Sequence, residues 1–274
     1  MGSGAAKACE LRRDVLDMGF RSKAGHIGGA LSVMDILVAL YYNVMNIGPK
    51  NADCRDRDRF LLSKGHSAAS LYAVLADRGF FDKRELERFS VYDSPFIGHP
   101  NNEINGVEMN TGALGHGLSL GVGMALAARL DKRPYRTYVV MGDGELAEGS
   151  NWEAVMAASH FKLDNLCAIV DRNKLQISGP TESVVSLENL LERFSSFGWN
   201  VLQVDGHDHD ALLKAFDSAL GCKGRPSVLI AHTVKGKGIS FMENRVEWHH
   251  RVPDEAEYKR AVAELERGMR EAEG

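Results

Sequence analysis

Apolar residues along this chain gather in short continuous runs, which are separated by longer stretches with helical periodicity. The runs are rich in Val, Ile and Leu and do not alternate with polar residues, a pattern typical of strands buried on both faces of a parallel sheet. In the second half of the chain, runs and helical stretches alternate regularly. This order predicts an α/β fold with a doubly wound, mostly parallel sheet flanked by helices. The predicted strands are residues 59–63, 137–141, 166–170, 200–204 and 227–231.

Helices are predicted where apolar residues recur at helical spacing. Ser32 is the expected N-cap of one of them, because a serine side chain can accept a hydrogen bond from the first turn. Residues 90–115 are rich in Gly, Pro and Asn and predict a long loop, and loops of that length inside a compact domain are usually functional. The predicted helices are residues 7–20, 32–43, 67–77, 114–130, 151–160 and 211–220, one that ends at residue 197, and a charged surface helix after residue 253.

The composition is that of a globular protein with a substantial core. The chain has 274 residues, of which 44% are hydrophobic and 26% charged, so we expect a single domain over residues 1–274 with a C-terminal helical tail. The formal net charge of -4 argues against a nucleic-acid partner, which would need a basic surface. No apolar run approaches the roughly 18 residues that a membrane span requires. Four widely spaced cysteines fit reduced thiols and a cytoplasmic location.

Polar residues with metal-ligand chemistry follow two of the predicted strands. Gly-Asp-Gly, with Asp143 at its centre, ends the strand at 137–141, and Asn173 closely follows the strand at 166–170. Ligands bind beyond the carboxyl ends of strands in such sheets. Mg²⁺ and Ca²⁺ prefer oxygen ligands, and Asp143, the Asn173 amide and one backbone carbonyl could supply three. The glycines let the backbone approach a phosphate closely.

Gly-Asp-Gly followed about thirty positions later by asparagine resembles the thiamine diphosphate motif. The resemblance implies a bound thiamine diphosphate and Mg²⁺, with Ca²⁺ or Mn²⁺ able to substitute. It assigns the metal to Asp143, Asn173 and the carbonyl of Leu175, and gives Gly144 and Asn173 contacts with the cofactor. The family pattern often has two asparagines, and Arg172 replaces the first. We expect this departure to have little effect, because the ligating asparagine is retained.

Histidine-bearing segments narrow the resemblance to transketolases, because they occur in that family's order along nearly the whole chain. The segment around His116 departs from the usual TTGPLGQG, with Ala113 for proline and His116 for glutamine. Histidine suits the chemistry because its pKa lies near 6.5, so it can move protons at neutral pH. The segments are KAGHIGG at 23–29, DRFLLSKGH at 58–66, GHP at 98–100, NTGALGHG at 110–117 and WHH at 248–250.

The resemblance also implies the role of each site residue. It surrounds the donor hydroxyls with His26, His99 and His249. It places Glu148 at a subunit interface that links two active sites, although a solvated carboxylate at a helix start is an alternative. The register at residues 248–250 is open, and we prefer His249 over His250. The residues implied to contact the cofactor are His66, Gly112, Ala113, Leu114, Gly144, Asn173 and His249.

The activity implied is that of the N-terminal, diphosphate-binding subunit of a split transketolase. Such an enzyme transfers a two-carbon glycolaldehyde unit from a ketose or ketose phosphate to an aldose or aldose phosphate. The pyrimidine-binding domain with its catalytic glutamate, and a third domain, are absent from this sequence. We therefore expect both on a C-terminal partner subunit, in an α2β2 assembly.

Alternatives remain at this point. One is the α subunit of a 2-oxo acid dehydrogenase, although those proteins lack this set of histidines. A deoxyxylulose-phosphate synthase fragment fits Gly98-His99-Pro100 less well. Another possibility keeps the glycolyl transfer but uses an unusual acceptor, such as a sulfonated or branched sugar or a carrier-bound group. A non-catalytic scaffold subunit would not need Asp143, Asn173 and the histidines.

Three further segments invite a site interpretation. Residues 205–210, Asp-Gly-His-Asp-His-Asp, could bind zinc, but an N-cap turn explains them better because they lie between a strand and a helix. Residues 117–123 resemble a dinucleotide fingerprint but lie within a predicted helix, where that motif does not function. Residues 235–238, Lys-Gly-Lys-Gly, fit a phosphate contact and a flexible surface loop equally well.

Overall fold

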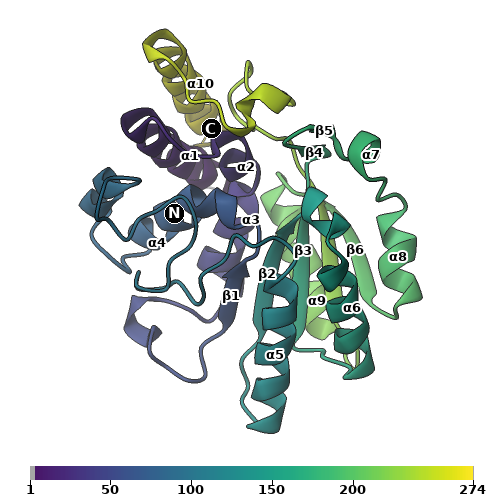
Figure 1. Cartoon of the computed structure of the whole chain (residues 1–274). Coiled ribbons are helices and arrows are strands. Elements are labelled where there is room, and N and C mark those ends of the chain that lie inside the picture. Colours follow the sequence, from purple (N-terminus) through teal and green to yellow (C-terminus); the bar gives the residue numbers. More distant parts are fainter. Residues whose placement is uncertain (1–3, 274) are drawn as a thin grey trace.

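A five-stranded parallel sheet forms the centre of the computed structural model, with the strand order β1-β2-β3-β7-β6 (Figure 1). The structure describes residues 4–273, so residues 1–3 and 274 of the predicted domain lie outside the described residues. The predicted α/β fold is confirmed, and each predicted strand is found within two residues of its expected bounds. The strands are β1 Arg59–Leu62, β2 Thr137–Gly142, β3 Leu166–Arg172, β6 Asn200–Asp205 and β7 Ser227–His232.

Burial varies across the sheet. Every residue of β3 is buried, as its continuous apolar run predicts. In β6 only Val204 is fully buried, and Gln203 is exposed. The expectation that all strands are buried on both faces is therefore wrong for β6. β6 lies at one edge of the sheet, where its Val201 and Leu202 pack against the two cores but are only partly buried.

Helices cover both faces of the sheet, and successive strand residues point to opposite faces. In β2, Tyr138 and Val140 join the core under α1, α3, α4 and α9, whereas Val139 and Met141 join the core under α5, α6 and α8 (Figure 1). The α-helices are α1 Gly4–Ser22, α2 Ile27–Ser32, α3 Met34–Ala39, α4 Ala68–Asp77, α5 Gly117–Leu130, α6 Gly149–His160, α7 Thr181–Val184, α8 Leu190–Ser196, α9 His209–Gly221 and α10 Glu255–Glu273.

Short elements connect the main ones. The hairpin β4–β5 follows β3 in the chain and forms a separate two-stranded sheet. The loop predicted at residues 90–115 contains turns and bends but no helix or strand. The remaining elements are η1 Leu40–Val44, η2 Pro49–Asn51, η3 Gly65–Ser67, η4 Lys83–Arg88, η5 Gly144–Ala147, η6 Val246–His249, β4 Leu175–Gln176 and β5 Gly179–Pro180.

Ser32 is not an N-cap, so that prediction is wrong. It is the buried last residue of α2, and its hydroxyl donates a hydrogen bond to the Asp171 carboxylate at 2.7 Å and lies 3.0 Å from the Gly29 carbonyl oxygen. The glycine-rich segment before it is helical, and its glycines allow close packing. A Cβ at Gly28 would lie 2.8 Å from the carbonyl oxygen of Trp248. Glycine at position 28 is therefore needed for the close backbone contact with Trp248 and not for a turn.

The C-terminal helix α10 lies alongside α1, so the first and last helices of the chain are neighbours (Figure 1). Ala261 and Leu265 of α10 are buried, and the other positions of the helix are partly or fully exposed. The predicted surface helix is thus confirmed as one that covers the domain with a narrow apolar face. None of the helices formed by residues 4–273 combines the length and the apolar character that a bilayer crossing requires.

Candidate active site

A cavity of about 380 Å³ opens at the carboxyl ends of β2 and β3. All predicted site residues except Ala113 line it. Ala113 is exposed and outside the lining, because the chain turns through positive φ at Gly112 and again at Gly115. The predicted residues that line the cavity are His26, His66, His99, Gly112, Leu114, Asp143, Gly144, Glu148, Asn173, Leu175 and His249.

One side of the cavity is the oxygen-ligand edge, formed by Asp143, Asn173 and Leu175. Oδ1 of Asp143 accepts a hydrogen bond from the Gly144 amide at 2.8 Å, and Oδ2 accepts one from the Lys174 amide at 2.6 Å. Oδ1 of Asn173 accepts one from the Leu175 amide at 3.1 Å. These bonds join the ends of β2 and β3 into one rigid unit.

Burial, together with the neighbouring Asp171 carboxylate, raises the pKa of Asp143. A bound cation would offset that penalty, because it favours the charged carboxylate. The donor set is a carboxylate, an amide oxygen and a backbone carbonyl, which are hard oxygen ligands suited to Mg²⁺ or Ca²⁺. The edge therefore fits a divalent metal of that class.

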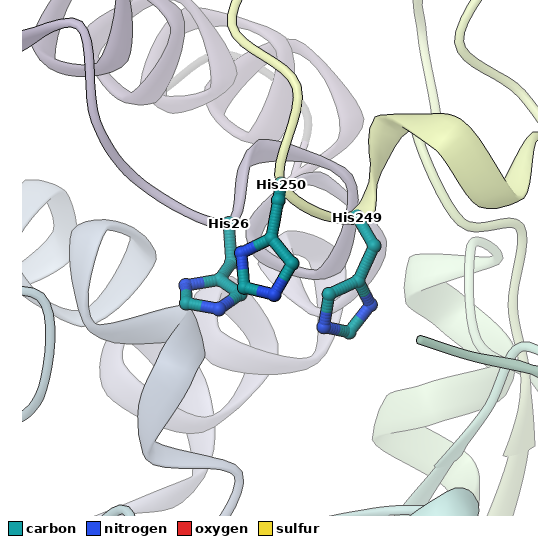
Figure 2. A group of neighbouring side chains, drawn as sticks. All are labelled: His26, His249 and His250. Atoms are coloured by element: carbon teal, nitrogen blue, oxygen red, sulfur yellow. The ribbon is translucent and has the colours of Figure 1, made fainter. Parts of the chain in front are cut away.

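The facing side is an imidazole cluster formed by His26, His66, His99, His249 and His250. The ring centroid of His26 lies 5.3 Å from those of His66 and His249, and 4.2 Å from that of His250. Figure 2 shows His26, His249 and His250 together, and one ring nitrogen of each lies within 4.8 Å of the others. The structure therefore brings both His249 and His250 into the cavity.

Four imidazoles of this cluster, those of His26, His66, His99 and His249, have lowered pKa values that favour the neutral ring. Burial, with smaller contributions from His250 and His99, lowers the pKa of His26 to about 4. Burial and the nearby Lys235 lower the pKa of His249 to about 3. Burial also lowers the pKa of His66 and His99. A neutral imidazole carries one donor and one acceptor nitrogen, so these rings can bind hydroxyl groups from both sides. Nδ1 of His26 is buried and has no hydrogen-bond partner within residues 4–273.

Two lysines in the cavity were not among the predicted site residues. Lys235 is only 2% exposed, so the flexible-surface-loop alternative is wrong for it. Its Nζ lies 2.6 Å from Nδ1 of His249 and 3.4 Å from the Leu175 carbonyl oxygen. Burial, together with the nearby positive charge of Lys64, lowers the pKa of Lys235 to about 8. Lys64 is 1% exposed, and the only signal for it was its position inside the DRFLLSKGH segment.

A buried carboxylate, Asp171, ties the cavity walls together. It accepts hydrogen bonds from Ser32, Lys64 and Thr233. Burial alone would raise the pKa of Asp171, but the adjacent Lys64 ammonium outweighs it and lowers the pKa. The three donors belong to the segments that carry His26, His66 and Lys235. Asp171 therefore sets the relative placement of residues that are far apart in the sequence.

Two glutamates follow the Gly-Asp-Gly turn and differ in environment. Glu145 is 3% exposed and accepts hydrogen bonds from the amides of Gly115 at 2.9 Å and Gly142 at 3.0 Å. It therefore joins the Gly-Asp-Gly turn to the NTGALGHG loop. Glu148 is exposed at the rim of the cavity and makes no side-chain cap bond to α6. Its role at a subunit interface stays a prediction.

Two of the three further segments, residues 205–210 and 117–123, behave as predicted. The Asp208 carboxylate caps α9 by accepting a hydrogen bond from the Ala211 amide at 2.9 Å. His207 pairs with Asp35, whereas His209 pairs with Asn43. The two imidazoles thus serve different partners. Residues 117–123 lie within α5, which excludes the strand-to-helix turn that dinucleotide binding needs.

Comparison with solved structures identifies the class of protein. The transketolase of Campylobacter jejuni matches with a TM-score of 0.90 and 31% sequence identity, covering 100% of this chain and 46% of that chain. The transketolase of Leishmania mexicana matches with a TM-score of 0.88 and 29% sequence identity, covering 99% of this chain and 45% of that chain. The chain thus spans slightly less than half of the length of these proteins. Its fold is the diphosphate-binding α/β fold of thiamine diphosphate enzymes.

The sequence comparisons settle the family. The family described as "Transketolase, thiamine diphosphate binding domain" matches residues 5–269, and the chain belongs to it. One of the subunits of the apulose-4-phosphate transketolase of Phocaeicola vulgatus is 48% identical over 254 residues, which is 93% of this chain and 90% of that protein. A 6-deoxy-6-sulfo-D-fructose transketolase subunit of Clostridium sp. is 42% identical over 244 residues, 89% of each chain. The expected N-terminal subunit of a split transketolase-type transferase is thereby confirmed.

Proposed function

We propose that the cavity binds thiamine diphosphate together with Mg²⁺, for which Ca²⁺ or Mn²⁺ can substitute. The observation that carries this proposal is the convergence of the oxygen-ligand edge and the imidazole cluster on one cavity. Asp143, Asn173 and the carbonyl of Leu175 would hold the metal. His66, Gly144 and Lys235 would face the diphosphate, where an ammonium and backbone amides suit an anion. Gly112 and Leu114 would contact the cofactor through their backbones.

The imidazole cluster would bind the sugar donor. When bound, thiamine diphosphate supplies the electron sink for cleavage of a carbon–carbon bond. The chain's contribution is to orient the donor and to accept or return its hydroxyl protons. Their lowered pKa values favour the neutral form of His26, His99 and His249. His26 and His99 can each donate to one oxygen and accept from another, whereas His249 keeps only Nε2 for the donor because its Nδ1 is bonded to Lys235. Glu148 at the cavity rim would meet the neighbouring subunit.

The reaction is a transfer of glycolaldehyde from a ketose to an aldose. The relatives described above belong to an apulose-4-phosphate transketolase and to a 6-deoxy-6-sulfo-D-fructose transketolase. Their names favour a branched or sulfonated sugar as one substrate of this chain, beside the ordinary pentose phosphates. The α subunit of a 2-oxo acid dehydrogenase is not favoured, because the family match covers residues 5–269.

A partner subunit would complete the site. Two relatives of similar length are named as one of the subunits of a transketolase, and this supports a C-terminal partner that carries the pyrimidine domain and its catalytic glutamate. We place the two chains in an α2β2 assembly in the cytoplasm. The four cysteines are all free in the structure, in keeping with a reducing compartment.

The test is co-expression of this chain with its C-terminal partner, followed by an assay of hydroxypyruvate consumption with ribose 5-phosphate as acceptor. The two separated chains, each assayed without the other, are the controls. We expect turnover that depends on thiamine diphosphate and on the presence of both chains. Donor consumption without a ketose product would retain the glycolyl transfer and identify a modified sugar as the acceptor. Full turnover by the isolated chain would contradict the split-enzyme assignment.

A further inference from the structure

Arg172 is the one departure from the family's paired asparagines, and the structure gives it a set of contacts that the sequence did not predict. It is the last residue of β3, directly before the predicted metal ligand Asn173. Its side chain is 1% exposed. A buried guanidinium is costly unless its donors are paired, so its partners show what it does.

The guanidinium joins two parts of the site. Nη1 donates to Oδ2 of Asp143 at 3.1 Å and to Oγ1 of Thr181 at 2.8 Å. Nη2 donates to Oε1 of Glu182 at 2.8 Å and to Oε1 of Glu188 at 2.7 Å. One planar cation therefore connects the Asp143 carboxylate to three residues that follow the β4–β5 hairpin.

Those residues belong to a segment that carries a predicted metal ligand. We call residues 174–188 the hairpin segment. Its base is closed by a hydrogen bond from the Thr181 amide to the Lys174 carbonyl at 3.0 Å, next to Leu175. Its far end is folded back by Glu182, which accepts a hydrogen bond from the Leu187 amide at 3.1 Å. A displacement of Thr181 or Glu182 would therefore also displace the carbonyl of Leu175.

Charge explains why a cation is needed at this position. Asp143, Glu182 and Glu188 all direct carboxylate oxygens at the guanidinium. Without Arg172, three like charges would converge with no compensation, and like charges at such distances repel. Asp143 is buried and held by two backbone amides, whereas the two glutamates are 38% and 54% exposed. The hairpin segment would be the part that moves away.

We propose that Arg172 is a positioning residue, which fastens the hairpin segment to Asp143 so that the Leu175 carbonyl and the Asp143 carboxylate are held in place before metal and cofactor bind. This inference rests on the proposed function only for the identity of the metal ligands. The fastening itself is a property of the chain alone.

The experiment compares wild type with Arg172→Met, which keeps the length of the side chain and removes its charge. Backbone hydrogen exchange of the full chain, without cofactor, is expected to be at least about tenfold faster in residues 174–188 and unchanged in β2 and β7. With the partner present, half-saturation by thiamine diphosphate and Mg²⁺ is expected to require roughly 10 to 100 times more ligand. The turnover number at saturation should stay near the wild-type value.

Arg225→Met is the matched control, because Arg225 is exposed and far from the cavity in the turn before β7. Glu188→Gln is the second variant, because it removes one charged partner of Arg172 at the surface. It should loosen the hairpin segment to a smaller degree, and it keeps the test available even if Arg172→Met does not fold. Wild-type exchange in residues 174–188 of both variants would overturn the inference. If the wild-type pair fails to bind thiamine diphosphate, the proposed function falls, whereas the exchange result still decides the role of Arg172.

Discussion

The oxygen-ligand edge and the imidazole cluster line the same cavity but are built differently. At the edge, Asp143 and Asn173 accept hydrogen bonds from backbone amides one or two residues away or from the adjacent strand end. In the cluster, within residues 4–273, His249 alone has a hydrogen bond to its ring, and that bond involves Lys235. The edge is thus fixed by nearby backbone amides and by the Arg172 guanidinium, while most of the cluster's nitrogens are open toward the cavity.

This difference suits the two regions to different ligands, a cation at the edge and a sugar at the cluster. A divalent cation needs oxygen atoms at fixed distances, so a pre-formed edge loses little entropy when the cation binds. A sugar presents several hydroxyls, and neutral imidazoles with free nitrogens can match them. The two regions are held relative to each other by Asp171, which bonds to Ser32, Lys64 and Thr233. Four predictions test this division.

Asp171→Asn should have the largest effect, because it breaks the connection between the two regions. The change leaves the Lys64 ammonium buried without its carboxylate, and removal of one partner of a buried ion pair costs about 3–5 kcal/mol. Urea unfolding of the purified chain measures this loss. Glu255→Gln is the control, since it breaks the exposed pair with Lys259 on α10 and should change nothing measurable. A stability within about 1 kcal/mol of wild type would show that Asp171 is not the connection.

Asp143→Ala should come next, and it should affect the edge alone. Loss of a buried carboxylate ligand is expected to weaken binding of thiamine diphosphate with Mg²⁺ by at least about 100-fold. Titration of the paired enzyme with Mg²⁺ at saturating thiamine diphosphate measures it. Asp217→Asn on the exposed face of α9 is the matched control. Unchanged Mg²⁺ dependence would remove Asp143 from the metal site.

Much of the fold and of the edge could be predicted because the signals are contiguous in the sequence. The central strands are continuous apolar runs, and Asp143 and Asn173 each directly follow one of them. Asp171 and Lys235 could not be predicted in the same way. Their partners lie far away in the chain, as with Asp171 and Ser32 or Lys235 and His249, and only the folded sheet brings them together.

The burial of β6 could not be predicted for a related reason. Several positions of β6 are as apolar as those of a central strand, but the sequence of a strand does not tell where in the sheet that strand lies. The sequence predicts an N-cap at Ser32 because serine is strongly favoured just before an apolar helix. Ser32 instead ends α2, whose Gly28 packs closely against Trp248, and that contact depends on a segment more than two hundred residues later in the chain.

The cluster should make the domain sensitive to acid. In the unfolded chain its imidazoles take up protons near pH 6.5, whereas the folded chain keeps His26 neutral down to about pH 4. The unfolded state therefore binds more protons between these values, so stability is lost as the pH falls from 6.5 toward 4. His26→Gln should reduce the drop in Tm between pH 7 and pH 5 by about 2 °C. His160→Gln, at an exposed position on α6, should leave the drop unchanged, and equal slopes for His26→Gln and wild type would contradict the burial argument.

The smallest expected effect distinguishes two neighbours within the cluster. His249 is partly buried and bonded to Lys235, which in turn contacts Leu175, whereas His250 is exposed. His249→Ala removes a hydrogen bond and disturbs that lysine, so the half-saturating donor concentration of the paired enzyme should rise by roughly tenfold. His250→Ala should raise it by less than about threefold, because an exposed ring loses little on replacement by water. His160→Ala provides the surface control. The reverse order would make His250 the principal donor ligand, and the register of the WHH segment would then shift by one residue relative to the preference for His249.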